Sequence, residues 1–335
     1  MEAEQAMKRR TLGKSGFQVS EIGLGCWQLG GDFGPLDDQR AKSILDESRE
    51  RQIDFWDTAD VYGAGQSESR IGRWLRENAA AGPRPIVATK VGRSAELYPN
   101  GYTKEKVRTS LEGSLRRIGG DALDLVQLHC VPFEVLRAGD ILAWMEDFQR
   151  SGLIHHFGAS VETVEEGLFC LGHPGVVSLQ IIFNLFRQDA VPELLPKAEA
   201  ADVGIIVRLP LASGLLGGKM TANEEFAEVD HRRYNRDGQR FSVGETFSGL
   251  PFEKGVELVE RLRRKLPTDH AMGQWALRWI LDHPQVSTII AGTSRPSQVA
   301  ENAAASAIPP LSPEQHAELS KFYSQEVRTH VRGPI

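Results

Sequence analysis

Three apolar segments of this 335-residue chain end in side chains that can exchange protons. Each segment is rich in residues typical of buried strands and then breaks into polar residues. The carboxyl ends of parallel strands meet at one edge of an α/β fold, which is where such folds place their active sites. We therefore expect one site to contain the side chains that end these segments, which are Asp57 and Tyr62, Lys90, and His129.

Taken singly, each of these residues has an ordinary structural explanation. An Asp after a strand often caps a helix, a Tyr often packs at a rim, and a Lys is usually solvated. Lys90 differs because it ends an apolar strand and is followed only by Val91 and Gly92, where a packed barrel offers little solvent. An ammonium group in such a place needs a counter-charge, and Asp57 is the obvious carboxylate.

Composition restricts the class of protein. Hydrophobic residues make up 41% of the chain and charged residues 25%, which is ordinary for a globular protein with a large core. The net charge of −6, without a basic stripe, argues against a nucleic-acid partner. No apolar run approaches the roughly 20 residues that span a bilayer, and residues 1–10 lack the apolar stretch of a secretory signal. We expect a cytoplasmic protein with no membrane partner.

The cysteines also favour the cytoplasm and give no sign of a metal site. The chain has three, Cys26, Cys130 and Cys170, and none lies in a Cys-x-x-Cys pair. An odd, scattered set is typical of reduced thiols. Adjacent histidine and cysteine residues, such as His129 and Cys130, point to opposite faces of a strand. We expect no metal.

Strand-like apolar segments alternate with helix-like amphipathic segments along the whole chain. Eight such pairs favour a closed (β/α)8 TIM barrel over an open doubly wound sheet. We expect one domain over residues 1–335, with a β-hairpin at 9–20 and a long loop at 220–267 near the active-site face. The expected strands centre near residues 22, 54, 87, 125, 156, 179, 206 and 288, and the expected helices cover 38–51, 68–78 with Ser67 as cap, 103–118, 140–151, 162–171, 192–201, 268–282 and 296–305.

Two familiar phosphate-binding motifs fail in this sequence. Gly13-Lys14-Ser15 resembles the end of a P-loop, but the glycine required five residues earlier is Lys8. The dinucleotide fingerprint G-x-G-x-x-G fails because Gln28 occupies the third glycine position. A nucleotide bound by this chain must be held by a different motif.

Several motifs, in their order and spacing, resemble those of the aldo-keto reductases. The resemblance covers about residues 9–305. It implies a (β/α)8 barrel with a nicotinamide cofactor, usually NADPH, across the C-terminal mouth. The matching motifs are Gly23-Leu24-Gly25, Asp57-Thr58-Ala59 through Tyr62-Gly63, Thr89-Lys90, Gln127-Leu128-His129, Pro210 to Leu216, and Gly292-Thr293-Ser294-Arg295 with Gln298 and Glu301-Asn302.

The resemblance implies that Asp57, Tyr62, Lys90 and His129 are the catalytic tetrad of that family. Reduction of a carbonyl places negative charge on oxygen, which must be protonated or stabilised. Tyr62 would donate the proton, and the Lys90 ammonium would lower its pKa from about 10. Asp57 would hold Lys90 by an ion pair, and His129 would orient the carbonyl oxygen.

The resemblance also implies how the cofactor is bound. Ser160 and Gln180 would bind the nicotinamide carboxamide, and Ser294 with Arg295 would bind the 2′-phosphate, which favours NADPH over NADH. A glycine-containing loop from Leu209 to Lys219 would fold over the pyrophosphate. The full set of expected cofactor contacts is Gly25, Cys26, Trp27, Asp57, Ser160, Gln180, Arg208, Leu209, Pro210, Leu211, Ser213, Gly214, Leu215, Lys219, Gly292, Thr293, Ser294, Arg295, Gln298, Glu301 and Asn302.

Two residues depart from the family pattern. Val161 stands after Ser160 where an Asn is usual, which puts one amide contact in doubt. Arg208 stands where many members place an aromatic ring against the nicotinamide. A guanidinium can stack on a planar ring, but it would repel an oxidised, positively charged one, so Arg208 would favour reduced cofactor. The alternative is that Arg208 pairs with a carboxylate outside the site.

The leading hypothesis is an NADPH-dependent oxidoreductase that reduces a small or medium aldehyde or ketone to an alcohol. One alternative is a regulatory subunit that keeps the reductase barrel, as the potassium-channel β subunits do. Another is an aldolase in which Lys90 forms a Schiff base, which an ion pair with Asp57 argues against. The basic residues at 231–236 could close over the cofactor phosphates or be solvated, and the sequence leaves a homo-oligomer open.

Overall fold

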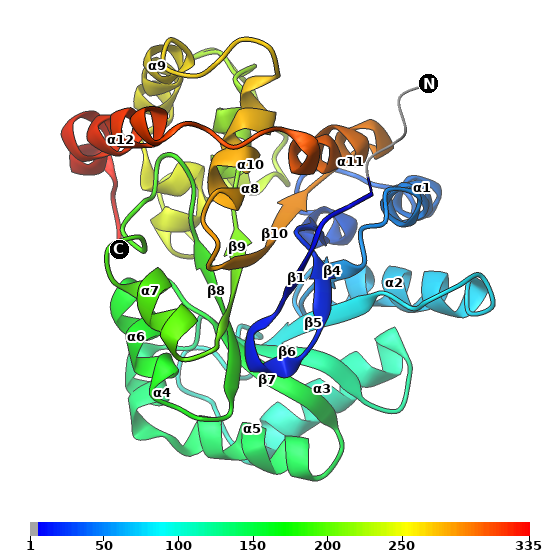
Figure 1. Cartoon of the computed structure of the whole chain (residues 1–335). Helices are drawn as coiled ribbons and strands as arrows, with labels where there is room; N and C mark the ends of the chain where they lie inside the picture. The colour runs from blue at the N-terminus through cyan, green and yellow to red at the C-terminus, as the bar shows by residue number, and fades with distance from the viewer. Residues whose placement is uncertain (1–5) are drawn as a thin grey trace.

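The computed structural model of the chain describes residues 6–335 and contains a closed barrel of parallel strands (Figure 1). Consecutive strands are neighbours, and the last strand pairs with the first. The TIM-barrel prediction is therefore confirmed. The strands are β3 (Ile22–Gly25), β4 (Phe55–Asp57), β5 (Ile86–Val91), β6 (Leu123–His129), β7 (Ile154–Ser160), β8 (Val176–Ile182), β9 (Gly204–Arg208) and β10 (Val286–Gly292).

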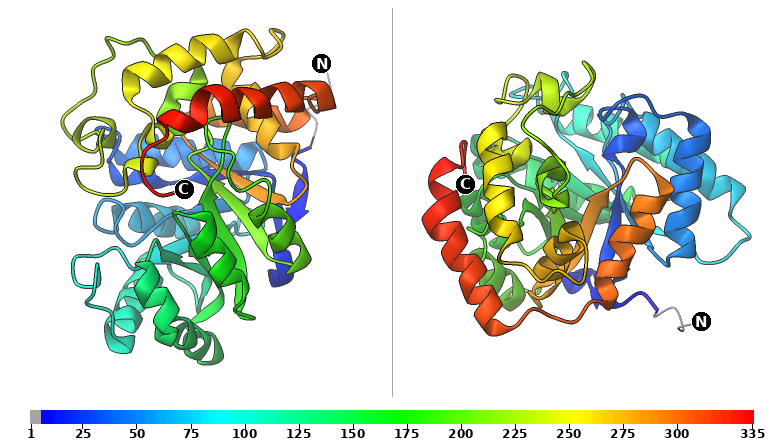
Figure 2. Two further views of the ribbon diagram at one scale, coloured as in Figure 1. Left: turned by 90° about the vertical axis from the view of Figure 1, so that its left-hand side faces the viewer. Right: turned by 90° about the horizontal axis from the view of Figure 1, so that it is seen from above.

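Helices surround the barrel, as the views from the side and from above show (Figure 2). Asp37 and Thr103 cap α1 and α3 through their side chains, as their sequence positions predict. The helices after successive strands are α1 (Asp38–Glu50), α2 (Gln66–Glu77), α3 (Lys104–Ile118), α5 (Asp140–Arg150), α6 (Val164–Leu171), α7 (Leu194–Ala200), α10 (Met272–Leu281) and α11 (Pro296–Ala303). Further helices are α4 (Phe133–Ala138), α8 (His231–Tyr234), α9 (Phe252–Arg263) and α12 (Pro313–Phe322).

Two local predictions were wrong, and a third was incomplete. Ser67 is not a cap, because α2 begins at Gln66 and the Ser67 hydroxyl donates to the carbonyl oxygen of Cys26 at 2.8 Å. The helix expected from residue 268 begins only at Met272. The long segment at 220–267 is partly helical, since it contains α9, whose buried residues Phe252, Gly255, Leu258, Val259 and Leu262 lie at helical spacing.

The N-terminal hairpin packs on the barrel's inner hydrophobic cluster. It consists of β1 (Arg9–Thr11) and β2 (Gln18–Ser20), paired antiparallel. Leu12 and Val19 are fully buried in a cluster with residues of six barrel strands, including Phe55. Gly13 has a φ of +48°, and a Cβ there would lie 2.4 Å from the backbone nitrogen of Gly204. Only glycine fits this contact.

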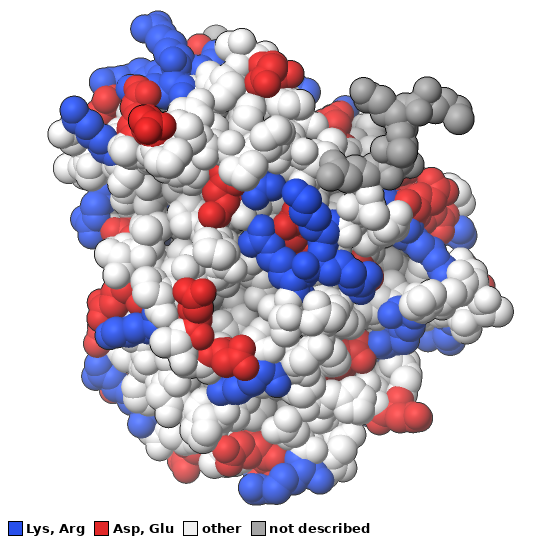
Figure 3. Space-filling view, viewed as in Figure 1, with Lys and Arg blue, Asp and Glu red and all other residues white. Residues whose placement is uncertain are grey.

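The outer surface carries interspersed basic and acidic side chains, with one larger group of Lys and Arg near the middle of the face in Figure 3. Acidic side chains lie within and around that group. Among residues 6–335, no helix has both the length and the apolar character needed to cross a bilayer.

Replacing Leu12 with Ala should destabilise the protein, because it leaves a cavity in the inner cluster. We expect the free energy of unfolding to fall by about 2–5 kcal/mol, as for other large-to-small changes in a core. Chemical denaturation measures the difference. The control is Lys14→Ala in the same hairpin, where the side chain is exposed. Equal stabilities of the two variants would show that the hairpin does not contribute to the core.

Candidate active site

The order of the strands brings the predicted catalytic side chains together. β4, β5 and β6 are neighbours in the barrel, and their carboxyl ends lie at the same rim. Lys90 lies opposite Gln127 of β6. His129 lies opposite Ser160 of β7. Residues separated by more than thirty positions in sequence are therefore adjacent, as the apolar segments predict.

Lys90 and Asp57 form a buried ion pair at this rim. Both side chains are 1% exposed. The Lys90 ammonium also donates to the carbonyl oxygen of Thr58 at 2.8 Å and to the Tyr62 hydroxyl at 3.2 Å. Burial lowers the pKa of Lys90, but the charges of Asp57 and Tyr62 outweigh burial and leave that pKa raised. Lys90 is thus a fixed positive charge in contact with a phenol.

Tyr62 is protonated in this environment. Burial raises the pKa of its hydroxyl above 10, and the opposing charge of Lys90 does not reverse the shift. The expectation of a lowered pKa is therefore wrong for the net value, although the ammonium acts in the predicted direction. The Trp27 ring stacks on the Tyr62 ring with centroids 5.7 Å apart and fixes its orientation.

His129 is a neutral imidazole beside this phenol. Its ring meets the Tyr62 ring edge-on, with centroids 5.9 Å apart. Burial, followed by the positive charges of Arg93 and Lys90, holds the pKa of His129 well below its usual range. Among residues 6–335, its buried Nδ1 has no hydrogen-bond partner. A neutral ring can donate one N–H to a substrate oxygen.

Gln180 and Ser160 lie side by side, as the sequence resemblance implies. The Ser160 hydroxyl donates to Oε1 of Gln180 at 3.5 Å. Gln180 also donates from Nε2 to the Asp57 carboxylate at 2.8 Å, a contact that the sequence did not indicate. Gln180 therefore orients Asp57 from the side opposite Lys90, and its contact with a nicotinamide stays a prediction.

A cavity of about 220 Å³ opens beside these residues. Tyr62 and His129 contribute to its wall, and the loop after β9 covers one side. The residues expected to contact a cofactor that line this cavity are Gly25, Cys26, Trp27, Asp57, Ser160, Gln180, Arg208, Leu209, Pro210, Leu211, Ser213, Gly214, Gly292, Ser294 and Gln298.

Six expected contacts do not line this cavity. Lys219, Arg295 and Glu301 are exposed beyond its edge. Leu215 is fully buried and packs against the position of Gly255. The other two are buried: Asn302 lies within α11, Thr293 precedes that helix, and the Thr293 hydroxyl has no partner among the described residues.

The cavity also has five lining residues that the sequence did not place there: Gln28, Phe33, Arg232, Glu245 and Ile290. Of the basic residues at 231–236, only Arg232 reaches the wall, and Asp230 holds its guanidinium at 2.6 Å. His231 is buried against the Trp27 ring at 4.6 Å. Contact between Arg232 and a cofactor phosphate stays a prediction, and His231 is buried and not solvated.

A second cavity, of about 470 Å³, is also lined by Tyr62 and His129. Aromatic rings form part of its wall, and charged side chains form another part. Most of these residues lie in loops, so their convergence could not be inferred from strand order. Its lining comprises Trp27, Asp32, Val61, Arg93, Tyr98, Glu162, Tyr234, Arg240, Phe241, Ser242, Val243, Glu245 and Pro334, together with Tyr62 and His129.

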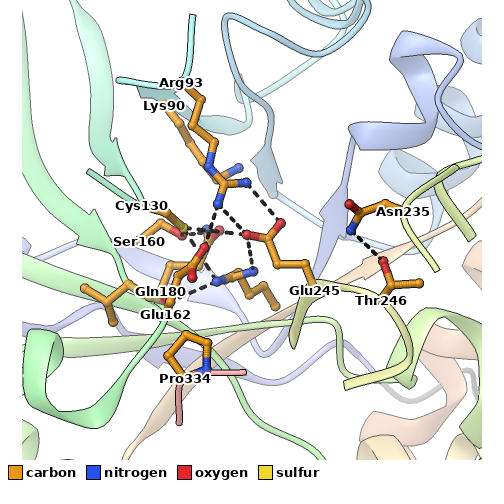
Figure 4. Close-up of polar contacts among 12 residues, drawn as sticks. Lys90, Arg93, Cys130, Ser160, Glu162, Gln180, Asn235, Glu245, Thr246 and Pro334 are labelled. Atoms are coloured by element: carbon orange, nitrogen blue, oxygen red, sulfur yellow. Dashed lines mark hydrogen bonds and ion pairs between the residues drawn. The ribbon is translucent and has the colours of Figure 1, made fainter. Parts of the chain in front are cut away.

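A network of carboxylates and guanidinium groups connects residues that line the two cavities (Figure 4). Arg93 donates to Glu162 at 2.8 Å and to Glu245 at 2.5 Å. Burial raises the pKa of Glu162 to about 7. Glu245 is buried, but the charges of Arg93 and Arg208 hold its pKa at about 2. The two carboxyl groups contact each other and their pKa values shift in opposite directions, so Glu162 holds a proton more readily than Glu245.

This network includes the one group of possible metal ligands among residues 6–335. Donor atoms of Cys130, Glu162 and Glu245 lie within 4.8 Å of one another. The guanidinium of Arg93 binds both carboxylates, and that of Arg208 lies 3.6 Å from the Cys130 sulfur. Two fixed cations at these donors disfavour a third, so the arrangement does not point to a metal centre.

Glu162→Gln should change how stability depends on pH. The pKa of Glu162 is raised from 4.5 to about 7 in the folded state. The folded protein therefore holds a proton that the unfolded chain releases in this range, and the free energy of unfolding falls as pH rises through it. The amide of the variant has no such proton to release, so the fall should be smaller and reflect other groups such as Asp60, whose pKa is raised to about 6.

Chemical denaturation from pH 4.5 to 8 measures this effect. The exposed Glu165, in a surface ion pair with Arg137, provides the matched control Glu165→Gln. The control should follow the wild-type curve. If Glu162→Gln also follows it, the carboxyl group does not titrate as the structure indicates.

The chain is similar to known proteins along most of its length. A model of the aldo/keto reductase family matches residues 21–324. The uncharacterized oxidoreductase YqkF of Bacillus subtilis is 28% identical over 328 residues, which cover 96% of this chain and 98% of that protein. A probable voltage-gated potassium channel subunit beta of Oryza sativa subsp. japonica is 29% identical, over 92% of this chain and 94% of its own length.

A solved structure is also similar over most of both chains. The holo form of aldo-keto reductase AKR11C1 from Bacillus halodurans is 28% identical and superposes with a TM-score of 0.75, covering 94% of this chain and 96% of that chain. The two chains therefore share the same fold over most of their length.

Proposed function

The chain belongs to the aldo/keto reductase family, and we propose that it is an NADPH-dependent oxidoreductase that reduces an aldehyde or ketone to an alcohol. The observation that carries this proposal is the position of Tyr62. Its side chain lines both cavities, and its hydroxyl lies 3.2 Å from the buried ammonium of Lys90. A carbonyl group entering from the second cavity therefore reaches an acid at the border of the first.

The residues at this border can protonate a carbonyl oxygen. Tyr62 is protonated at neutral pH and donates its proton as negative charge develops on the oxygen. The Lys90 ammonium stabilises the resulting phenolate, because it is fixed by Asp57 and cannot move away. Neutral His129 donates a hydrogen bond that orients the oxygen toward Tyr62.

The first cavity fits a nicotinamide cofactor. A bound NADPH would supply the hydride for reduction. Ser160 and Gln180 offer a hydroxyl and an amide on one wall, and two buried polar atoms there lack partners among the described residues, Gln28 Oε1 and Arg208 Nε. Groups of this kind are satisfied when a polar ligand binds. A Cβ at Gly292 would collide with the Gln28 side chain, so the glycine lets Gln28 lie directly against the end of β10.

The other functions considered have less support. The raised pKa of Lys90 keeps it charged, which disfavours a Schiff base. The similarity to a probable potassium-channel β subunit leaves a regulatory role as the alternative. The proximity of Tyr62, Lys90, Asp57 and His129 favours an enzyme over a protein that only regulates. We propose a cytoplasmic location, consistent with three free cysteines, while a homo-oligomer stays a prediction.

Tyr62→Phe should abolish proton donation while keeping the aromatic contact with Trp27. We expect kcat for carbonyl reduction to fall by roughly 10²–10⁴, the usual contribution of a general acid. NADPH oxidation followed by its near-ultraviolet absorbance with a panel of aldehydes and ketones measures the rate. NADPH affinity, measured by quenching of tryptophan fluorescence, should remain close to that of the wild type.

Two results would contradict the proposal in different ways. A Tyr62→Phe variant with wild-type turnover would exclude Tyr62 as the acid. A wild-type protein that binds NADPH without turning over any carbonyl in the panel would favour a regulatory role.

Arg295→Ala tests the preference for NADPH. Arg295 is exposed next to Ser294, and no ion pair of its side chain exists within residues 6–335. Loss of a charge-assisted contact to the 2′-phosphate should raise the Kd for NADPH roughly tenfold and leave the Kd for NADH unchanged. Arg233→Ala, which removes an exposed arginine paired with Glu228, is the control. Equal changes for both cofactors would exclude this role of Arg295.

A further inference from the structure

Glu245 is a buried carboxylate that the proposed reaction does not use. It lies in a short turn (Val243–Glu245) of the long segment at 220–267, which we call the insertion, and is 5% exposed. It lines both the first and the second cavity, a position it shares with Trp27, Tyr62 and His129. Its pKa of about 2 keeps it ionised at neutral pH. A permanent negative charge therefore borders both cavities.

The partners of Glu245 are two arginines from different strands. Arg93 follows β5 and donates to Glu245 through two nitrogens, at 2.5 and 3.1 Å. Arg208 ends β9, and its Nη1 lies 3.7 Å from the Glu245 carboxylate. Arg208 also donates to the carbonyl oxygen of Val161 at 3.0 Å, which fixes the guanidinium at the cavity wall. The insertion thus places its carboxylate on Arg93 and within ion-pair distance of Arg208, the arginine that lines the first cavity.

An unpaired Arg208 would act against oxidised cofactor. Arg208 lines the first cavity together with Ser160 and Gln180, where the nicotinamide is proposed to lie. The oxidised nicotinamide carries a positive charge, and the reduced form is neutral. Like charges in a buried site repel each other with little screening. The sequence-based alternative paired Arg208 with a carboxylate outside the site, whereas its ion-pair partner Glu245 lines the wall of the first cavity.

We propose that Glu245 is a positioning residue that neutralises Arg208 and thereby sets the relative affinity of the site for oxidised and reduced nicotinamide cofactor. This inference rests on the proposed function, because it requires a nicotinamide in the first cavity. The affinity for oxidised cofactor therefore depends on the ion pair between Glu245 of the insertion and Arg208 of the barrel. A site with Glu245 intact retains NADP⁺ more strongly than the same site without its charge.

The other carboxylate of the network does not have this position. Glu162 also binds Arg93, but it lines only the second cavity. Its pKa of about 7 leaves it partly protonated near neutral pH. Both carboxylates act on Arg208, but Glu245 is the one that forms an ion pair with it and lines the first cavity.

The test is the ratio of two dissociation constants in Glu245→Gln. Titration with NADP⁺ and with NADPH, followed by tryptophan fluorescence and repeated by calorimetry, gives Kd for each form. This substitution keeps the size of the side chain and removes its charge. The ratio Kd(NADP⁺)/Kd(NADPH) should rise roughly tenfold, the order that Coulomb's law gives for one unit charge near a buried site. A general loss of packing weakens both forms alike and leaves the ratio unchanged.

Two further variants make the result decisive. Arg208→Gln removes the opposite charge and should lower the ratio below the wild-type value, which provides a test even if Glu245→Gln fails to fold. Glu165→Gln, at an exposed surface pair with Arg137, should leave the ratio at the wild-type value. An unchanged or lowered ratio in folded Glu245→Gln would overturn the inference while the proposed function stands. Failure of the wild-type protein to bind either form would overturn both.

Discussion

The buried ion pair between Lys90 and Asp57 is the constraint on which the rest of the site depends. Two charges at 1% exposure are costly to desolvate, so removal of one partner would leave the other as an unpaired buried charge. The pair therefore requires β4 and β5 to keep their register. Its ammonium holds the Tyr62 hydroxyl, and Gln180 holds the carboxylate from β8. One interaction thus links three strands and orients the proposed acid.

The insertion contributes contacts to the site that the barrel strands do not supply. Glu245 reaches the network at the barrel rim, and His231 packs on Trp27. Asn184, after β8, donates to the Leu209 carbonyl at 2.9 Å and to the Ser248 hydroxyl at 2.8 Å, so the insertion is tied to the loop after β9. Leu209 and Ser248 both have positive φ, an unusual conformation that concentrates at functional sites. The cavities depend on loop contacts as much as on strand ends.

The sequence predicted the features that depend on short-range pattern. Alternating apolar segments were enough to predict the barrel, and the residues that end those segments predicted the convergence of Lys90 with Asp57 and Tyr62. Their convergence follows from parallel strand order alone. The helix α9 was missed, although its buried residues have helical spacing, because the surrounding Gly, Arg and Asn suggested a loop.

The sequence could not predict contacts between distant loops. Nothing in the pattern around Glu245 relates it to Arg93 or Arg208, since the three lie in separate loops and strand ends. The sequence also could not predict the direction in which the pKa of Tyr62 shifts. Burial raises this pKa more than the charge of Lys90 lowers it, and only the folded structure shows the extent of burial. Local chemistry is visible in a sequence, whereas desolvation is a property of the fold.

The most direct test of this account is a structure of the protein with NADP⁺ bound. The account predicts that the nicotinamide ring lies in the first cavity against Ser160, Gln180 and Arg208, with the Tyr62 hydroxyl facing its reactive carbon across the space for a carbonyl group. A dinucleotide bound elsewhere, or a nicotinamide ring separated from Tyr62 by protein, would contradict it.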